Sequence, residues 1–403
     1  MKKLLISLFV VITILLFSTY FMGEMVKNET QKMFVKSVPQ GVTSKLIRYD
    51  KGFLRATAVS EVRLAIEGEA PLVFDITSSI QHYPYKAVID NQIKLRDPLL
   101  TQKVETYFAS KDWLTSIEEV NLCGQLTGQL TLMAGSSSYG DGQFATKAVT
   151  LDYQMDLHHY TGAARLDWGG LQILTSEDDF SVESLHIKSN FNLLSAHSEY
   201  DYFVDIAKVA ILQADFQSRL AGIELLGSSR TGEQVDTIDT STEWRIARYE
   251  IDQDSKKLFT NNHIKLDIKG LYSPALNLLR GAAEDHQQVQ SAFAALLDHG
   301  GQLTLSKLNS QTPWGKVTGH LAVTVQPGAV FSDITLNPFM LLDYISGDAQ
   351  LLLPEALLQQ PNLSESLQLG LNTGFLIREA TNLSFETQFE QGELTVNGKV
   401  IPL

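Results

Sequence analysis

Strict alternation of apolar and polar residues is the commonest pattern after residue 40. In residues 151–158, leucine, tyrosine and methionine occupy one face of a predicted strand, and aspartate, glutamine and histidine occupy the other. Strands with one apolar face are typical of antiparallel sheets, and not of doubly wound parallel ones. The same pattern predicts strands over residues 124–132, 200–206, 242–251, 263–268, 301–308, 316–325 and 384–396.

Few helices are predicted, and they are recognised by the residues that typically begin a helix. A good N-cap residue followed by proline predicts a helix after Asp97, after Ser273 and after Asn337. The longest predicted helix covers residues 274–299, has one broad apolar face and a bend at Asp285 and His286, and stops at two glycines. Shorter helices are predicted over residues 354–360 and 364–372. The fold class is therefore mainly β (α+β), an extended antiparallel sheet with a few short helices and one longer amphipathic helix.

Three segments share a hairpin design in which an aromatic residue stands three positions before a glycine. The pairs are Tyr49 with Gly52, Tyr139 with Gly142, and Phe389 with Gly392. A short loop that closes on a left-handed residue would explain this spacing, because glycine adopts that conformation freely. We therefore predict a left-handed glycine in each of the three hairpins.

The N-terminal residues predict a membrane anchor. Residues 4–22 are uncharged and follow two lysines, and at about 1.5 Å per residue they span nearly the ~30 Å hydrocarbon core of a bilayer. Bulky aromatic residues, Tyr20 and Phe21, stand where a cleavable signal needs small ones, so a signal anchor is favoured over a cleaved signal and over a buried helix.

The predicted anchor determines in which compartment each of the other segments is expected. We expect residues 1–3 in the cytoplasm, residues 4–22 in the bacterial inner membrane, a juxtamembrane stem over residues 23–40, and a β-rich periplasmic ectodomain over residues 41–403. Lysines lie on both sides of the anchor, so the charge distribution alone does not set the orientation. Within the ectodomain, the only boundary that the sequence suggests is near Ser195 or Ser228.

Composition removes several classes of function. Acidic residues outnumber basic ones by 46 to 32, for a net charge of −14, which argues against nucleic acid as a partner. The single cysteine, Cys123, excludes an intrachain disulfide and a multi-cysteine zinc or iron–sulfur site, and we interpret it as a buried or strand thiol. The 44% of hydrophobic residues are enough for a sizeable core.

No catalytic motif stands out. The chain lacks the glycine-rich nucleotide loops, the serine nucleophile elbow and the zinc-protease helix motif. Asp152, Asp156 and His158 share one strand face, but we interpret them as a solvated face and not as a metal site. The acidic run at residues 177–179 is interpreted as a solvated turn, and the serines at residues 136–138 have no defined base. We therefore predict no catalytic residue, no metal ligand and no cofactor.

Four blocks of sequence resemble one family. Residues 46–56, 78–84, 222–270 and 389–399 are similar to segments of the YdgA-like proteins, a family of bacterial inner-membrane-anchored proteins of unknown function. The residues that carry the resemblance, and whose role is unknown, are Tyr49, Gly52, Phe53, His82, Pro84, Gly392, Asn397 and Gly398. Tyr83 stands where the family has glycine. The resemblance implies an anchored, periplasm-facing ectodomain that self-associates, and it brings no catalytic residues.

These observations predict a non-enzymatic, single-pass envelope protein whose ectodomain binds a partner or an amphipathic ligand. An antiparallel sheet with one apolar face must have that face covered by helices, by a second copy in a homo-oligomer, or by a lipid in an apolar groove. A homo-oligomeric scaffold and a lipid-binding role both stay open at this point. The alternative is an envelope hydrolase with an unrecognised polar site, in which His82 or His158 would serve as the base.

Overall fold

The computed structural model describes residues 2–35, 41–66, 68, 70–193, 199–253, 255–281 and 286–401. The protein is mainly β, and its described strand pairs are antiparallel, which confirms the predicted fold class at this level. The chain forms two compact units. The first contains residues 1–176 and 183–190, and the second contains residues 177–182 and 191–403. The division at residue 191 lies close to Ser195, whereas Ser228 lies inside a strand.

The first unit combines one long helix with a curved run of strands. Its elements are α1 (Lys2–Val35), β1 (Val42–Lys51), β2 (Arg55–Leu64), β3 (Leu72–His82), β4 (Lys86–Leu95), α2 (Pro98–Phe108), β5 (Leu114–Asn121), β6 (Gln125–Leu132), β7 (Gly135–Tyr139), β8 (Gly142–Thr146), β9 (Val149–Asp156) and β10 (Thr161–Leu174). The pairing order is β1-β2-β3-β4-β5-β6-β9-β10, and the β7–β8 hairpin pairs with β10 through β8. Strand β11 (Asp178–Asn192) has residues in both units.

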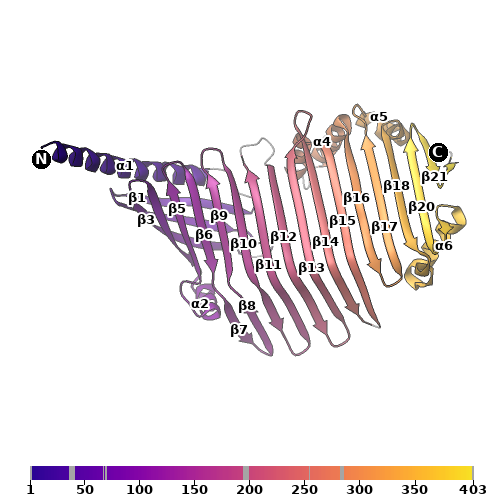
Figure 1. The fold of residues 1–403 in the computed structure, drawn as a ribbon, viewed down its shortest axis with the longest axis horizontal. Coiled ribbons are helices and arrows are strands. Elements are labelled where there is room, and N and C mark those ends of the chain that lie inside the picture. The colour runs from indigo at the N-terminus through magenta and orange to yellow at the C-terminus, as the bar shows by residue number, and fades with distance from the viewer. Residues whose placement is uncertain are drawn as a thin grey trace. The chain divides into compact units, whose positions relative to one another are not determined.

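Helix α1 packs on one face of this sheet. Thr19, Met22 and Val26 follow one another at helical spacing, and all three are buried. Met22 and Val26 join a core cluster with small and branched side chains of the strands, including Ala58 and Ile80. Towards its N-terminus, α1 extends past the strands (Figure 1). The side chains of Ile14 and Phe17 on α1 are exposed.

The predicted anchor lies in the N-terminal half of α1, and residues 23–35 of the predicted stem continue the same helix. Across the part of the chain that the structure describes, no helix is long and apolar enough to cross a membrane. The side chains of residues 2–12 and 33–35 and the whole of residues 36–40 lie outside that part.

The second unit is built from long strands that lie side by side in chain order from β12 to β18 (Figure 1). Its strands are β12 (Glu199–Gln213), β13 (Gln217–Thr231), β14 (Thr237–Asp252), β15 (Lys256–Tyr272), β16 (Gly301–Thr312), β17 (Gly315–Val325), β18 (Ile345–Pro354), β19 (Ile377–Glu379), β20 (Asn382–Glu390), β21 (Glu393–Val396) and β22 (Lys399–Ile401). Its helices are α3 (Ser273–Gly281), α4 (His286–His299), α5 (Phe331–Leu336), η1 (Pro338–Asp343), η2 (Glu355–Gln359) and α6 (Pro361–Thr373).

The helix start signals were confirmed where a cap forms. The Asp97 carboxylate accepts hydrogen bonds from the backbone N–H groups of Leu99 and Leu100 and starts α2. Asn337 caps only a 3-10 helix, and residues 355–359 form another. Helix α6 begins at Pro361, three residues before the predicted start. Proline is favoured at the first position of a helix, because a backbone N–H at that position would have no partner within the helix.

The predicted long helix over residues 274–299 is present as α3 and α4, and residues 282–285 between them lie outside the described part. The predicted strand over residues 384–396 is two strands, β20 and β21, with a turn between them.

The hairpin prediction was correct at one glycine and wrong at two. Gly392 has φ +77° in the β20–β21 turn, as predicted. Gly142 does not take the left-handed conformation, because Gly140 does so instead, with φ +61°. Gly52 does not take it either; an added Cβ there would lie 2.7 Å from the carbonyl oxygen of Arg55. Gly52 is therefore needed for a close backbone approach, not for its φ angle.

Candidate functional site

A cavity of about 410 Å³ lies between α1 and the sheet of the first unit. Val26, Glu29 and Thr30 of α1 line one side of it. The opposite side is lined by apolar side chains that project from the strands, among them Leu46, Ile76, Ile80, Ile89, Ile93, Val120, Leu126 and Leu130, and by Leu157 in the turn after β9. We call this cavity the α1 groove.

The apolar lining follows from the strand register. Ile80 of β3 lies opposite Ile89 of β4, and Ile76 lies opposite Ile93, so alternate residues of both strands project to the same face. This is the one-sided alternation that the sequence predicted, and α1 covers part of the resulting apolar face.

A strip of polar side chains crosses the floor of the α1 groove. Ser78, Asn91 and Ser116 stand opposite one another on β3, β4 and β5. The Ser78 hydroxyl donates to Asn91 Oδ1 at 2.6 Å, and Asn91 Nδ2 donates to Ser116 Oγ at 3.4 Å. Asn91 and Ser116 are buried, so the strip places hydrogen-bonding groups inside an otherwise apolar cavity.

A tyrosine–carboxylate pair continues the polar strip. Tyr153 of β9 donates its hydroxyl to Glu118 Oε1 of β5 at 2.6 Å, across the intervening strand β6. The residue between them is Gly128, and an added Cβ there would lie 2.3 Å from the Tyr153 ring. The missing side chain therefore leaves room for the ring to cross β6. Burial raises the pKa of Tyr153, and the Glu118 carboxylate raises it further, so the hydroxyl stays a neutral donor.

Two buried polar atoms near α1 have no hydrogen-bond partner within the described residues, the Tyr49 hydroxyl and His82 Nε2. Burial raises the pKa of Tyr49 to about 12. Burial also lowers the pKa of His82, and the nearby Lys51 ammonium adds to the effect, so the imidazole is held neutral. The other ring nitrogen of His82, Nδ1, lies 3.3 Å from the carbonyl oxygen of Phe53.

The motif residues from the N-terminal blocks gather around α1. Tyr49 packs against the core cluster, and His82 lies against Gly23 of α1. The carbonyl oxygen of Pro84 accepts a hydrogen bond from Ser18 of α1. Phe53, in the turn that Gly52 begins, is exposed. These residues of unknown role therefore mark the place where α1 meets the strands.

The motif residues near the C-terminus have a structural role in the second unit. Asn397 and Gly398 have φ +48° and +73° and form the tight turn between β21 and β22. Asn397 Nδ2 donates to the carbonyl oxygens of Gly374 and Phe375, and its Oδ1 accepts from the Glu386 N–H. This side chain therefore fastens the last hairpin to the loop after α6.

The remaining candidates from the sequence do not converge. The Asp156 carboxylate accepts hydrogen bonds from the backbone N–H groups of His158 and His159, and contact with the His159 ring helps to hold its pKa below the usual range. Asp152 accepts from Gln129. Among the described residues, no group of three histidine, cysteine or acidic side chains could hold a metal ion. Cys123 is exposed in the β5–β6 turn, so its interpretation as a buried or strand thiol was wrong.

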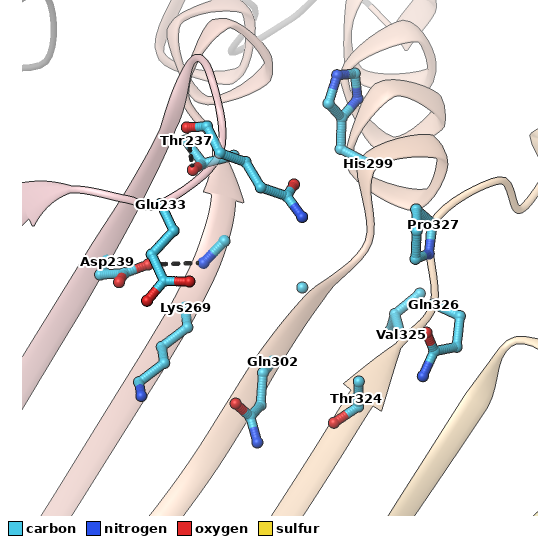
Figure 2. Close-up of a pocket in the computed structure, with 13 residues that line it drawn as sticks. Glu233, Thr237, Asp239, Lys269, His299, Gln302, Thr324, Val325, Gln326 and Pro327 are labelled. Carbon is cyan, nitrogen blue, oxygen red and sulfur yellow. Dashed lines mark hydrogen bonds between the residues drawn. The ribbon is translucent and has the colours of Figure 1, made fainter.

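A second cavity, of about 350 Å³, lies in the second unit at the ends of β14 to β17 (Figure 2). Polar side chains dominate its lining, including Glu233, Lys269 and Gln302. Asp239 accepts a hydrogen bond from the Gly270 N–H at 2.8 Å, and the neighbouring Thr237 hydroxyl donates to the Gln234 carbonyl. These polar contacts brace the ends of the strands.

One face of the long strands in the second unit carries an apolar ladder. It runs from strand to strand through Val204, Leu225, Trp244, Ile264 and Leu308, which stand opposite one another. All five side chains keep partial or full exposure, and Trp244 is 44% exposed. We call this row the apolar ladder; it is the uncovered part of the one-sided pattern that the sequence predicted.

The polar strip and the Tyr153–Glu118 pair were missed by the sequence reasoning. A signal for the strip is present in β3, where Ser78 interrupts the inward-facing series of Phe74, Ile76 and Ile80. A signal for the pair is weaker, because Glu118 and Tyr153 are separated by 35 positions and meet only through the pairing of β6 with β9.

Comparison with known proteins places the chain at the level of a family. No curated protein and no solved structure shows significant similarity to it. A family model described as "Bacterial protein of unknown function (DUF945)" matches residues 1–403. Because the match spans the whole chain, this protein belongs to the DUF945 family of bacterial proteins.

Proposed function

We propose that this chain is a YdgA-like, single-pass protein of the bacterial inner membrane that binds an amphipathic ligand in the α1 groove. Residues 4–22 are the anchor, and the strands of both units lie in the periplasm. The uncharged run of residues 4–22 supports the anchor, because its length suits the hydrocarbon core of a bilayer.

The observation that carries this proposal is the polar strip inside an apolar cavity. A volume of about 410 Å³ is within the usual range of small-molecule sites, which are mostly apolar with a few placed polar groups. Isoleucines and leucines from β1 to β9 would contact an acyl chain. Asn91, Ser116 and the Tyr153–Glu118 pair would hydrogen-bond a hydroxyl, amide or ester near its head.

The proposed role is binding without catalysis. The hydrolase alternative with His82 as its base would need a nucleophile beside that ring. His82 Nδ1 instead faces a main-chain carbonyl oxygen, and burial holds its ring neutral. Tyr153 is a hydrogen-bond donor with a raised pKa, which suits recognition of a ligand better than proton transfer near neutral pH.

The apolar ladder supports a second proposed role, in which copies of this protein associate with one another as a scaffold. Its half-exposed leucine, isoleucine and tryptophan side chains lie on a row that a second copy could cover. Ligand binding and self-association involve different units, so they can be measured separately.

Native mass spectrometry of the full chain, purified from bacterial membranes in mild detergent, tests the binding proposal. We expect a co-purified lipid-sized adduct on the wild-type protein. Thr30→Trp, which fills the α1 groove from the helix, should remove the adduct. Asn28→Trp is the matched control, because Asn28 is exposed on the same helix and does not line the groove.

Two results would contradict the binding proposal: a wild-type protein without any adduct, or equal adduct occupancy in Thr30→Trp and Asn28→Trp. The same spectra report the scaffold role, because a monomer at all protein concentrations would exclude stable self-association.

A further inference from the structure

Exposed apolar side chains collect at the turns of the first unit. Phe53 and Leu54 lie in the β1–β2 turn, Tyr83 and Tyr85 in the β3–β4 turn, and Leu122 in the β5–β6 turn. Each of these side chains is exposed, and Tyr85 is 63% exposed. We call these five residues the turn patch. Because β1 to β6 are consecutive antiparallel neighbours, these three turns lie at the same end of the strands.

Backbone contacts hold the turns together as one surface. The His82 N–H donates to the Leu54 carbonyl at 2.8 Å, which joins the first turn to the second. The Leu122 N–H donates to the Tyr85 carbonyl at 3.2 Å, which joins the second turn to the third. The three turns are therefore held next to one another by the same hydrogen bonds that end the strands.

The turn patch lies beside α1 at the end of the predicted anchor. Ser18 of α1 donates its hydroxyl to the Pro84 carbonyl, between the two tyrosines of the patch. Lys51, directly before the first turn, places its ammonium 4.0 Å from the centre of the Tyr20 ring. At about 1.5 Å per residue, Ser18 lies only about 6 Å from the Met22 end of the apolar run. The patch is thus level with the last turn of that run.

The side chains of α1 at this level are themselves apolar and exposed. Ile14, Phe17 and Phe21 point away from the strands, whereas Thr19 and Met22 are buried against them. The helix is continuous from Lys2 to Val35, so the residues that pack on the strands and the residues of the apolar run belong to one rigid rod. A membrane around the apolar run would therefore meet the turn patch.

We propose that the turn patch inserts into the headgroup region of the bilayer in which α1 is anchored, so that the first unit rests on the membrane surface in one orientation. This inference rests on the anchor of the proposed function. Tyrosine and phenylalanine are the side chains that prefer the membrane interface, where an apolar ring and a polar edge are both accommodated. The lipid surface is favoured over a protein partner because the apolar run of α1 emerges at the patch itself.

Spin labels on the full chain in lipid nanodiscs test this contact. In a Cys123→Ser background, three single-cysteine variants are compared: Tyr85→Cys in the turn patch, Ile14→Cys in the anchor, and Leu99→Cys on α2. Leu99 is 71% exposed and lies at the opposite end of the strands, in the connection between β4 and β5. Relaxation by oxygen, which concentrates in lipid, and by a water-soluble nickel complex gives the depth of each label.

We expect an oxygen-to-nickel ratio several-fold higher for Tyr85→Cys than for Leu99→Cys, and highest for Ile14→Cys. A label at Tyr85→Cys as exposed to water as that at Leu99→Cys, with Ile14→Cys in lipid, would overturn the inference and leave the anchor standing. A label at Tyr85→Cys protected from both reagents would also overturn it, by showing a protein cover. Water exposure at Ile14→Cys would instead refute the anchor.

Discussion

The replacement Gly128→Ala should disturb the α1 groove through a single methyl group. In the native structure the Tyr153 ring crosses over Gly128 to reach Glu118, and an added Cβ would come within 2.3 Å of the ring. Contacts that short do not occur between real atoms, so the ring must move away from β6. We expect the hydrogen bond between the Tyr153 hydroxyl and the Glu118 carboxylate to be lost.

The expected cost follows from three terms. A hydrogen bond to a charged acceptor contributes about 1.5–3 kcal/mol to stability. Steric overpacking of this kind typically costs about 1–3 kcal/mol. Alanine in place of glycine within a strand recovers about 0.5–1 kcal/mol, because the unfolded chain loses less entropy on folding. The net prediction is a loss of roughly 2–5 kcal/mol from the free energy of unfolding of the first unit.

Urea denaturation of the detergent-solubilised full chain, followed by tryptophan fluorescence, measures this loss, since Trp113 and Trp168 report on the first unit. A double-mutant cycle with Tyr153→Leu isolates the cause. Once the ring is absent, Gly128→Ala should be neutral or slightly stabilising. An equal loss in both backgrounds would refute the reasoning, because it would place the cost in the backbone of β6.

The second unit provides a matched control. Gly227 lies under the ring of Tyr202 in the same way, and an added Cβ there would come within 2.3 Å of the ring. Gly227→Ala should therefore also reduce stability, but it should leave the lipid-sized adduct unchanged. Gly128→Ala should reduce the adduct as well. Loss of the adduct in Gly227→Ala would show that stability, and not the geometry of the α1 groove, controls binding.

Three further predictions concern other contacts. Burial lowers the pKa of His82 in the folded state. Below about pH 6.5 the unfolded state therefore takes up the proton first, and the free energy of unfolding falls as the pH falls. His82→Leu should reduce the change in urea midpoint between about pH 7.5 and pH 5. Asp97→Ala removes the N-cap of α2 and should cost about 1 kcal/mol in the same denaturation assay, whereas Asp97→Asn should cost little. Asn397→Ala removes the side-chain hydrogen bonds to Gly374, Phe375 and Glu386 and should lower the stability of the C-terminal hairpin by about 1–3 kcal/mol. Limited proteolysis should then cut this hairpin faster than in the wild type. An unchanged rate of proteolysis would show that other contacts hold the hairpin.

Local features of the fold could be predicted where neighbouring residues determine them. Alternation in residues 301–308 and 316–325 predicted β16 and β17, because a half-buried strand needs side chains of opposite polarity on its two faces. The cap at Asp97 was predicted because its carboxylate reaches N–H groups only two and three residues away. Gly142 was predicted wrongly because either of two neighbouring glycines could take the left-handed position of its turn.

The candidate site could not be predicted in the same way. Ser78 and Ser116 meet Asn91 only through the registers of two strand pairs, and a one-residue shift would turn these side chains to the other face. Tyr153 reaches Glu118 because β6 pairs with β9, while β7 and β8 form a hairpin of their own. The YdgA-like resemblance, the anchor and the periplasmic location stay predictions, and of these the spin-label experiment tests the anchor.

The sequence by itself determined the one-sided antiparallel strands, the uncharged N-terminal run and the absence of the common catalytic motifs, because each of these depends on residue type and short spacing alone. The tertiary structure decided that α1 packs on the strands of the first unit and encloses a groove with a polar floor, while the apolar ladder of the second unit stays half-exposed. The reason is physical: an apolar face specifies that it must be covered, but only the register and the path of the chain decide which element covers it.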